Sequence, residues 1–156
     1  MGIDYEALYR RLLPLARVVA PRGVDGSDLV QEALTRALAR HPHLSGIRDP
    51  FAYLSAAVVN TARSWGARTA RRVQLEGKWE GHSIASDGDG AVEMLMRLPP
   101  RQRACLYLRF VEDLAVVDVA RHLGCSTGTV KSQTSKALTT LRSLLENEAE
   151  LGGRTA

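Results

Sequence analysis

The chain has 156 residues, of which 45% are hydrophobic, 24% charged and 5% aromatic, and its formal net charge at pH 7 is +4. These values are typical of a globular protein with a mainly aliphatic core, and the small basic excess favours an acidic partner without identifying one. The two cysteines, Cys105 and Cys125, form no C-x-x-C pair, which excludes a zinc knuckle. No apolar stretch approaches the length of a membrane span and the first residues do not form a signal peptide, so we expect a cytoplasmic protein that contacts no membrane.

Apolar residues recur at helical spacing in almost every segment, and no segment alternates as a strand does, which predicts an all-α fold. We expect a first helix over about residues 5–19 and a second helix that is capped by Asp25 or Ser27. Residues 41–50 contain two prolines, a glycine and a serine, and should form a loop. A third helix should start near Phe51 and end in a basic stretch.

The composition changes after this third helix. Residues 73–92 are rich in glycine, serine and aspartate, which predicts a flexible linker, although Trp79 is unusual in such a segment. We therefore expect two small helical domains, over residues 1–72 and 93–146, followed by a fraying tail over residues 147–156.

The second domain carries the pattern of a helix-turn-helix over residues 98–145. Amphipathic helices are expected over residues 101–110 and 114–123, each with apolar residues on one side. Gly124 suits the left-handed conformation that ends a helix, and Ser126 can cap the helix that follows. A short turn with glycine between two such helices is the signature of this motif. The side chains expected to face inward include Phe110, Leu138 and Leu145.

The last helix presents a polar face that is suited to duplex DNA. The polar residues lie in its N-terminal half, which is the half that enters the major groove in this motif. Lysine can donate to guanine or to phosphate, and serine and threonine can both donate and accept at several bases. The candidate DNA-binding residues are Thr127, Thr129, Lys131, Ser132, Ser135 and Lys136. Spacing alone leaves open an ordinary three-helix domain with a solvated polar face.

Two sets of residues resemble the bacterial sigma-70 family of transcription factors. The resemblance to region four is carried by Leu98-Pro99-Pro100-Arg101, Leu108-Arg109-Phe110 and the run from Val119 to Ser132. The resemblance to region two is carried by Asp28-Leu29-Val30-Gln31-Glu32, Phe51-Ala52-Tyr53-Leu54 and Asn60. The gap between the two is too short for a folded region three, as in the extracytoplasmic-function (ECF) group. The stretch around Gln133 is similar to an actinobacterial, sigma-E-like subset of that group.

The resemblance implies an initiation factor that is not an enzyme and has no catalytic residue, metal or cofactor. Such a factor binds core RNA polymerase through the beta-prime and beta subunits, recognises the minus-ten and minus-thirty-five promoter elements and promotes initiation. An anti-sigma partner is compatible with it. The residues at the matching polymerase-docking positions are Asp28, Gln31 and Glu32. The residues at the matching minus-ten positions are Asn60, which would hold an unstacked base, and Arg63, Arg68, Arg71 and Arg72, which would hold phosphates.

Three alternatives stay open on the sequence alone. A helix-turn-helix regulator that never joins polymerase would explain residues 98–145 but would leave the residues of the first domain without a role. An enzyme is disfavoured, because His41 and His43 lack a third ligand and no phosphate loop or nucleophile motif occurs. The third alternative is an interaction module whose helices bind only proteins. Val116 and Val117 depart from the family pattern, and as exposed valines they could pack against polymerase or a regulator.

Overall fold

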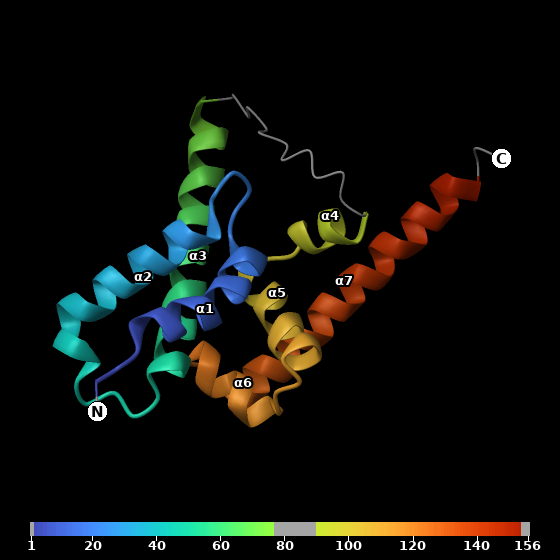
Figure 1. The fold of residues 1–156 in the computed structure, drawn as a ribbon. Coiled ribbons are helices and arrows are strands. Elements are labelled where there is room, and N and C mark those ends of the chain that lie inside the picture. The colour runs from blue at the N-terminus through green and yellow to red at the C-terminus, as the bar shows by residue number, and fades with distance from the viewer. Residues whose placement is uncertain (1, 77–89, 154–156) are drawn as a thin grey trace.

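The computed structural model describes residues 2–76 and 90–153, and in these residues the chain is helical apart from short connections (Figure 1). The helices are α1 (Tyr5–Val19), α2 (Gly26–Arg40), the 3-10 turn η1 (Pro42–Leu44), α3 (Pro50–Glu76), α4 (Gly90–Met96), α5 (Pro100–Leu106), the π-helical turn η2 (Tyr107–Val111), α6 (Val116–Leu123) and α7 (Thr127–Gly153). The predicted all-α class is confirmed. None of the described helices is long and apolar enough to cross a membrane. The centre of the expected linker, with Trp79, lies outside the described residues.

Side-chain caps determine where the first two helices begin. The Asp4 carboxylate accepts a hydrogen bond from the Ala7 amide at 3.0 Å, and the Asp25 carboxylate accepts from the Ser27 amide at 2.9 Å and from its hydroxyl at 3.0 Å. Asp25 is therefore the N-cap of α2, and Ser27 supports it. These bonds to Ser27 lower the pKa of Asp25, which keeps the carboxylate ionised at the positive end of the helix.

One continuous apolar core runs through both halves of the chain. Helix α3 packs against α1, α2, α5 and α6, and α1 also packs against α5. The fully buried large side chains of this core are aliphatic, as the low aromatic content predicts. They are Leu12, Leu15, Val19, Leu29, Val30, Leu44, Leu54, Val58 and Val59 from the first half and Leu108, Val119 and Leu123 from the second. The helix-turn-helix half thus lies directly on helices α1–α3.

Some side chains of the second half do not lie where the helical spacing predicts. Phe110, Leu138 and Leu145 were expected to face inward and are 60%, 44% and 57% exposed. The helix widens into the π-helical turn η2 before Phe110, and each wider turn shifts the register of the following side chains. The C-terminal part of helix α7 projects away from the α1–α3 half, and among the described helices α4 also contacts α7 (Figure 1).

Several boundaries also differ from the prediction. The helix expected over residues 114–123 begins at Val116, and the residues expected to fray from 147 onward are helical as far as Gly153. Helices α3 and α4 extend into both ends of the segment expected as a linker. Of the two valines expected to be exposed, Val117 is 67% exposed, whereas Val116 is half-buried against the core.

Candidate nucleic-acid interface

Helices α6 and α7 are joined by the tight turn that the glycine predicted. Gly124 has φ 65° and ψ 37°, the left-handed conformation that costs glycine least, and the Cys125 amide donates to the Ala120 carbonyl at 3.0 Å. The Ser126 hydroxyl accepts from the Thr129 amide at 3.1 Å and so caps α7. These two local devices set the angle between the helices of the helix-turn-helix.

The N-terminal half of α7 exposes the side chains expected to contact DNA. Val130 and Ala137 are fully buried and fix the inner face of the helix. The side chains of Thr127, Lys131, Ser132, Ser135 and Lys136 are all exposed. At about 3.6 residues per turn the last four lie on the side away from the buried pair, and Thr127 flanks them. Within the described part of the chain, neither lysine forms an ion pair, so both ammonium groups are available to an anion. Thr129 is half-buried and its hydroxyl lies 2.9 Å from that of Ser126, which ties it to the cap.

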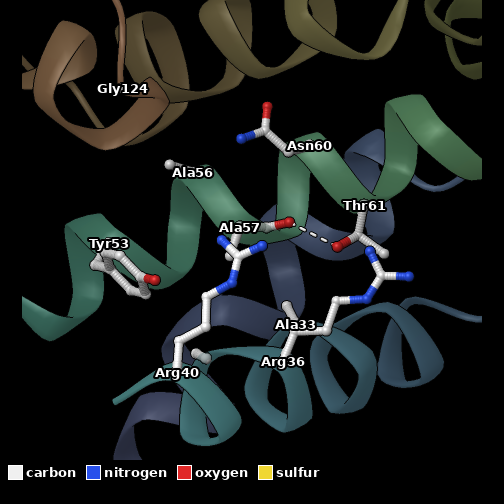
Figure 2. A pocket seen from close by; sticks show the side chains of 10 residues that line it. Ala33, Arg36, Arg40, Tyr53, Ala56, Ala57, Asn60, Thr61 and Gly124 are labelled. Carbon is white, nitrogen blue, oxygen red and sulfur yellow. Dashed lines mark hydrogen bonds between the residues drawn. The ribbon is translucent and has the colours of Figure 1, made fainter.

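A pocket of about 510 Å³ lies between α2 and α3 and reaches the turn of the helix-turn-helix (Figure 2). The residues that line it are Ala33, Arg36, Ala37, Arg40, Tyr53, Ala56, Ala57, Asn60, Thr61 and Gly124. In Figure 2 the side chains of Arg36 and Arg40 extend from α2 toward α3, and Asn60 projects from α3 on the side of the turn. The pocket therefore has a basic side, an amide and an aromatic ring in one groove.

The groups in this pocket match the chemistry of a single-stranded nucleotide. Guanidinium groups bind phosphate, an amide can both donate to and accept from a base edge, and a tyrosine ring offers a stacking surface. The Nε of Arg36 forms an ion pair with Glu32 at 2.7 Å, whereas Arg40 forms no ion pair within the described residues. The Tyr53 ring stands edge-on to His41, with centroids 5.5 Å apart.

The sequence prediction placed Asn60 in this region but missed Arg36, Arg40 and Tyr53. The signal for the arginines was their spacing of four residues, which puts both on one face of α2 beside Ala33 and Ala37. The same spacing occurs on many solvent-exposed helix faces and does not by itself indicate a binding site. Only the position of α3 opposite α2 shows that both arginines line a pocket.

The other predicted residues lie on the surfaces around the pocket. Arg63, Arg68, Arg71 and Arg72 are exposed on α3 beyond Asn60, and so extend the positive charge along that helix. Asp28 and Gln31 are exposed on α2, and Glu32 is half-buried in its ion pair. His41 and His43 flank the turn η1, but the described residues contain no group of three potential metal ligands.

The loop before α3 is held in an unusual backbone conformation. His43 and Leu44 have φ values of 57° and 56°, in the left-handed region that non-glycine residues rarely adopt. Leu44 is buried in the core, and Asp49 closes the loop by accepting from the Ala52 amide at 3.0 Å. His43 is exposed at the surface, in the turn η1 that packs against α2.

Comparison with known proteins identifies the family. Residues 94–143 match the family model "Sigma-70, region 4". The chain is 37% identical over 142 residues to the RNA polymerase sigma-E factor of Streptomyces avermitilis, covering 87% of this chain and 79% of that protein. It is 30% identical over 145 residues to the ECF RNA polymerase sigma factor SigM of Mycobacterium tuberculosis, covering 88% of this chain and 72% of that protein. The chain belongs to the ECF sigma factors.

The alignment of this ECF sigma factor with its relatives runs well beyond region four. Matches over 84% of the chain or more, including one of 36% identity to the sigma-E factor of Streptomyces coelicolor, also take in helices α1–α3. The fold is shared with the sigma factor RpoE of Bartonella quintana, crystallised with the anti-sigma factor NepR, at a TM-score of 0.69, 24% identity and coverage of 90% of this chain and 93% of that chain. The predicted resemblance to the sigma-E-like ECF group is confirmed.

Proposed function

We propose that this ECF sigma factor binds core RNA polymerase in the cytoplasm and directs it to promoters, with α7 on the minus-thirty-five element and α3 on the minus-ten element. It acts by assembly and not as an enzyme, and it needs no cofactor. The observation that carries the proposal is the presence, in one chain, of an exposed polar recognition face on α7 and of the Asn60 pocket on α3.

On the upstream element, α7 enters the major groove of the duplex. Lys131 and Lys136 donate to phosphates or guanine edges, and the hydroxyls of Thr127, Ser132 and Ser135 contact bases or backbone. Thr129 acts mainly through the cap, because its hydroxyl is tied to Ser126. Small side chains at these positions favour a readout that depends on phosphates and DNA shape.

On the downstream element, the pocket holds a nucleotide of the separated strand. The Asn60 amide contacts an unstacked base, whose extrusion costs a few kcal/mol that pocket contacts offset. Arg40, which lines the pocket, binds the phosphate of that nucleotide. Arg63, Arg68, Arg71 and Arg72 hold the backbone of the neighbouring DNA.

Polymerase docks on α2, where Asp28, Gln31 and Glu32 accept bonds from basic groups of the beta-prime subunit. A regulator that acts without polymerase is the alternative function. It is disfavoured because relatives that are named sigma factors align with α1–α3 as well as with the helix-turn-helix.

The proposal is tested by transcription in vitro with core polymerase on a genomic fragment library, followed by mapping of start sites. Discrete starts that share two upstream elements are expected. If the chain binds promoter duplex tightly alone and fails to bind core polymerase, the regulator is the correct interpretation.

Three matched pairs of variants test the surfaces. Lys131→Ala with Lys136→Ala should lower the affinity for the upstream element and reduce the salt dependence of that affinity by about one unit of slope per lysine. Arg142→Ala, farther along α7, is the control and should change neither.

Asn60→Ala should reduce open-complex formation while leaving duplex binding intact, with exposed Gln74→Ala as the control. Asp28→Ala with Glu32→Ala should weaken polymerase binding, with Glu6→Ala as the control. Equal polymerase affinities would refute the docking assignment.

A further inference from the structure

We propose that the C-terminal end of α7 is a self-association surface, which docks on the distal end of α3 in a second copy of this chain. The contact joins two copies and needs neither polymerase nor DNA. Its consequence, that a second copy and nucleic acid compete for the same end of α3, rests on the proposed function.

The distal end of α3 is basic and carries an exposed leucine. Residues 63–75 contain four arginines and no acidic residue. Arg68, Arg71 and Leu75 follow one another at spacings of three and four residues, so they lie on one face of the helix. Leu75 is 80% exposed, and neither Arg68 nor Arg71 forms an ion pair within the described residues. This face therefore offers positive charge and apolar surface together.

The C-terminal end of α7 has the opposite charge. Residues 144–153 lie beyond the segment that matches region four, yet they are helical. They contain three glutamates and no basic residue. Glu146 and Glu150 lie four residues apart on one face, and Leu151, which is 66% exposed, lies at the edge of that face. Neither of these two glutamates forms an ion pair in the part of the chain that the structure describes.

The two faces are complementary in spacing as well as in charge. If α3 and α7 pack antiparallel, the register that places Arg68 beside Glu150 also places Arg71 beside Glu146, because side chains three or four residues apart are neighbours on a helix. Exposed ion pairs alone contribute little. Leu75 and Leu151 lie at the two ends of the same contact, and their burial adds an apolar contribution.

The two ends do not meet within one chain. Helix α3 packs against α1, α2, α5 and α6, whereas α7 packs against α4, α5 and α6, and the distal ends of α3 and α7 project apart (Figure 1). Helix α7 is continuous and its N-terminal half is fixed by the buried Val130 and Ala137, so its end cannot swing onto α3 without breaking the helix.

A second copy presents both faces. A two-fold axis then forms the contact twice, with α3 of each copy on α7 of the other. The paired surface is small, so we expect a weak and reversible dimer. Arg68 and Arg71 belong both to this contact and to the surface that the proposed function assigns to the DNA backbone. The phosphates of DNA therefore compete with the glutamates of a second copy.

Sedimentation velocity of the full chain tests the self-association. A dimer is expected at about 0.1 M salt and a monomer at about 1 M, because the screening length falls from about 10 Å to about 3 Å. A chain that stays monomeric up to about 1 mM at the lower salt would overturn the proposal. A dimer that does not respond to salt would overturn the pairing of charges.

Charge reversal identifies the two surfaces. Glu146→Lys with Glu150→Lys should weaken the dimer at least about tenfold, and Arg68→Glu with Arg71→Glu should do the same. A one-to-one mixture of these two chains should dimerise again, because each of its two contacts then joins opposite charges. A mixture that stays monomeric would refute the pairing of α3 with α7 between copies.

The matched control for the glutamate reversal is Glu6→Lys with Glu148→Lys, which changes the net charge equally and should leave the dimer intact. Glu6 lies on α1, and Glu148 faces α4, since its Oε2 lies 3.9 Å from a Cβ built on Gly90. Circular dichroism establishes that each variant keeps its helices. Equal loss of the dimer in the control would show that net charge, and not the paired faces, determines the association.

Competition with DNA is tested by adding a single-stranded oligonucleotide to the dimer. The sedimenting species should become one chain with DNA, and an intact dimer bound to DNA would overturn the competition. The proposed function is tested separately, because the Glu146→Lys, Glu150→Lys chain should still start transcription with core polymerase. Loss of transcription in this chain alone would show that the end of α7 serves polymerase and not a second copy. Absence of transcription in the wild type as well would overturn the proposed function, whereas the dimer is measured without polymerase.

Discussion

Acidification is expected to destabilise the folded chain through His122. The residue is 5% exposed, with its ring against Phe51 and its Nδ1 near the Ser55 hydroxyl. In this site the neutral imidazole is favoured over the charged form, which cannot be hydrated there.

The surroundings of His122 include groups that raise its pKa and groups that lower it. Burial is the largest influence and lowers the pKa of His122 below its usual 6.5. Asp49 and Asp118 oppose this shift, and Arg121 and Arg11 reinforce it. The net direction is downward, so the unfolded chain binds one proton more than the folded chain at pH values between the folded pKa and 6.5.

The sign and size of the effect follow from this difference of one proton. The contribution of His122 to stability is fully present above pH 6.5 and is lost as the pH falls toward the folded pKa. Within that window the free energy of unfolding should fall by at most about 1.4 kcal/mol per pH unit. A loss of that size is large against the roughly 5–15 kcal/mol that stabilises a domain.

The assay is urea unfolding, followed by circular dichroism, at several values between about pH 7.5 and about pH 5. His122→Gln cannot gain a charge and should show a shallower pH dependence than the wild type. The carboxylates titrate in both chains and cancel in the difference, and His41→Gln is the control for loss of a histidine elsewhere. An identical pH dependence of His122→Gln and wild type would show that the buried imidazole does not control acid stability.

Three further substitutions test the local structure by thermal or urea unfolding. Gly124→Ala should cost about 1–2 kcal/mol because its positive φ strains alanine, and Gly124→Asn should cost less; equal costs would contradict the conformational explanation. Leu54→Ala should cost about 2–5 kcal/mol because Leu54 is fully buried, whereas Leu151→Ala, at an exposed position, should have little effect. Ser126→Ala should cost about 1 kcal/mol by removing the cap of α7, and a comparable loss in exposed Ser132→Ala would refute that role.

The helices of the first half could be predicted because their signals are local. Helix α1 spans Tyr5–Val19 as predicted, and α2 starts at the aspartate cap. Such signals act through the nearest residues along the chain and do not depend on the rest of the fold. The turn at Gly124 was predictable for the same reason.

The connection between α5 and α6 was not predictable from spacing. There the Arg109 guanidinium donates to the Leu114 carbonyl at 2.6 Å and the Tyr107 hydroxyl donates to Glu112 at 2.8 Å. These side-chain bonds span the π-helical turn and the left-handed Asp113, and Phe110 lies exposed beside them. A periodicity that assumes a regular α-helix cannot anticipate such bonds.

The pocket and the buried hydrogen bonds of Arg103 could not be predicted because they form between segments far apart in sequence. Arg40 and Gly124 face the same groove, and Arg103 binds carbonyls 84 and 83 residues away. Neither arginine, Arg40 or Arg103, has a local sequence pattern that distinguishes it from an ordinary surface arginine. Only the packing of α5 and α6 on α1–α3 gives them these positions.

The small number of basic side chains on the recognition face of α7 has an energetic consequence for the proposed function. If Lys131 and Lys136 each neutralise one phosphate, α7 contributes a salt slope of only about −1.8, which is too little to hold a promoter at physiological salt. Under the proposed function, the helix-turn-helix therefore binds its element firmly only when polymerase docking on α2 and the minus-ten contacts of α3 add to its own contacts. Under that proposal, promoter affinity belongs to the initiation complex as a whole and not to the recognition helix alone.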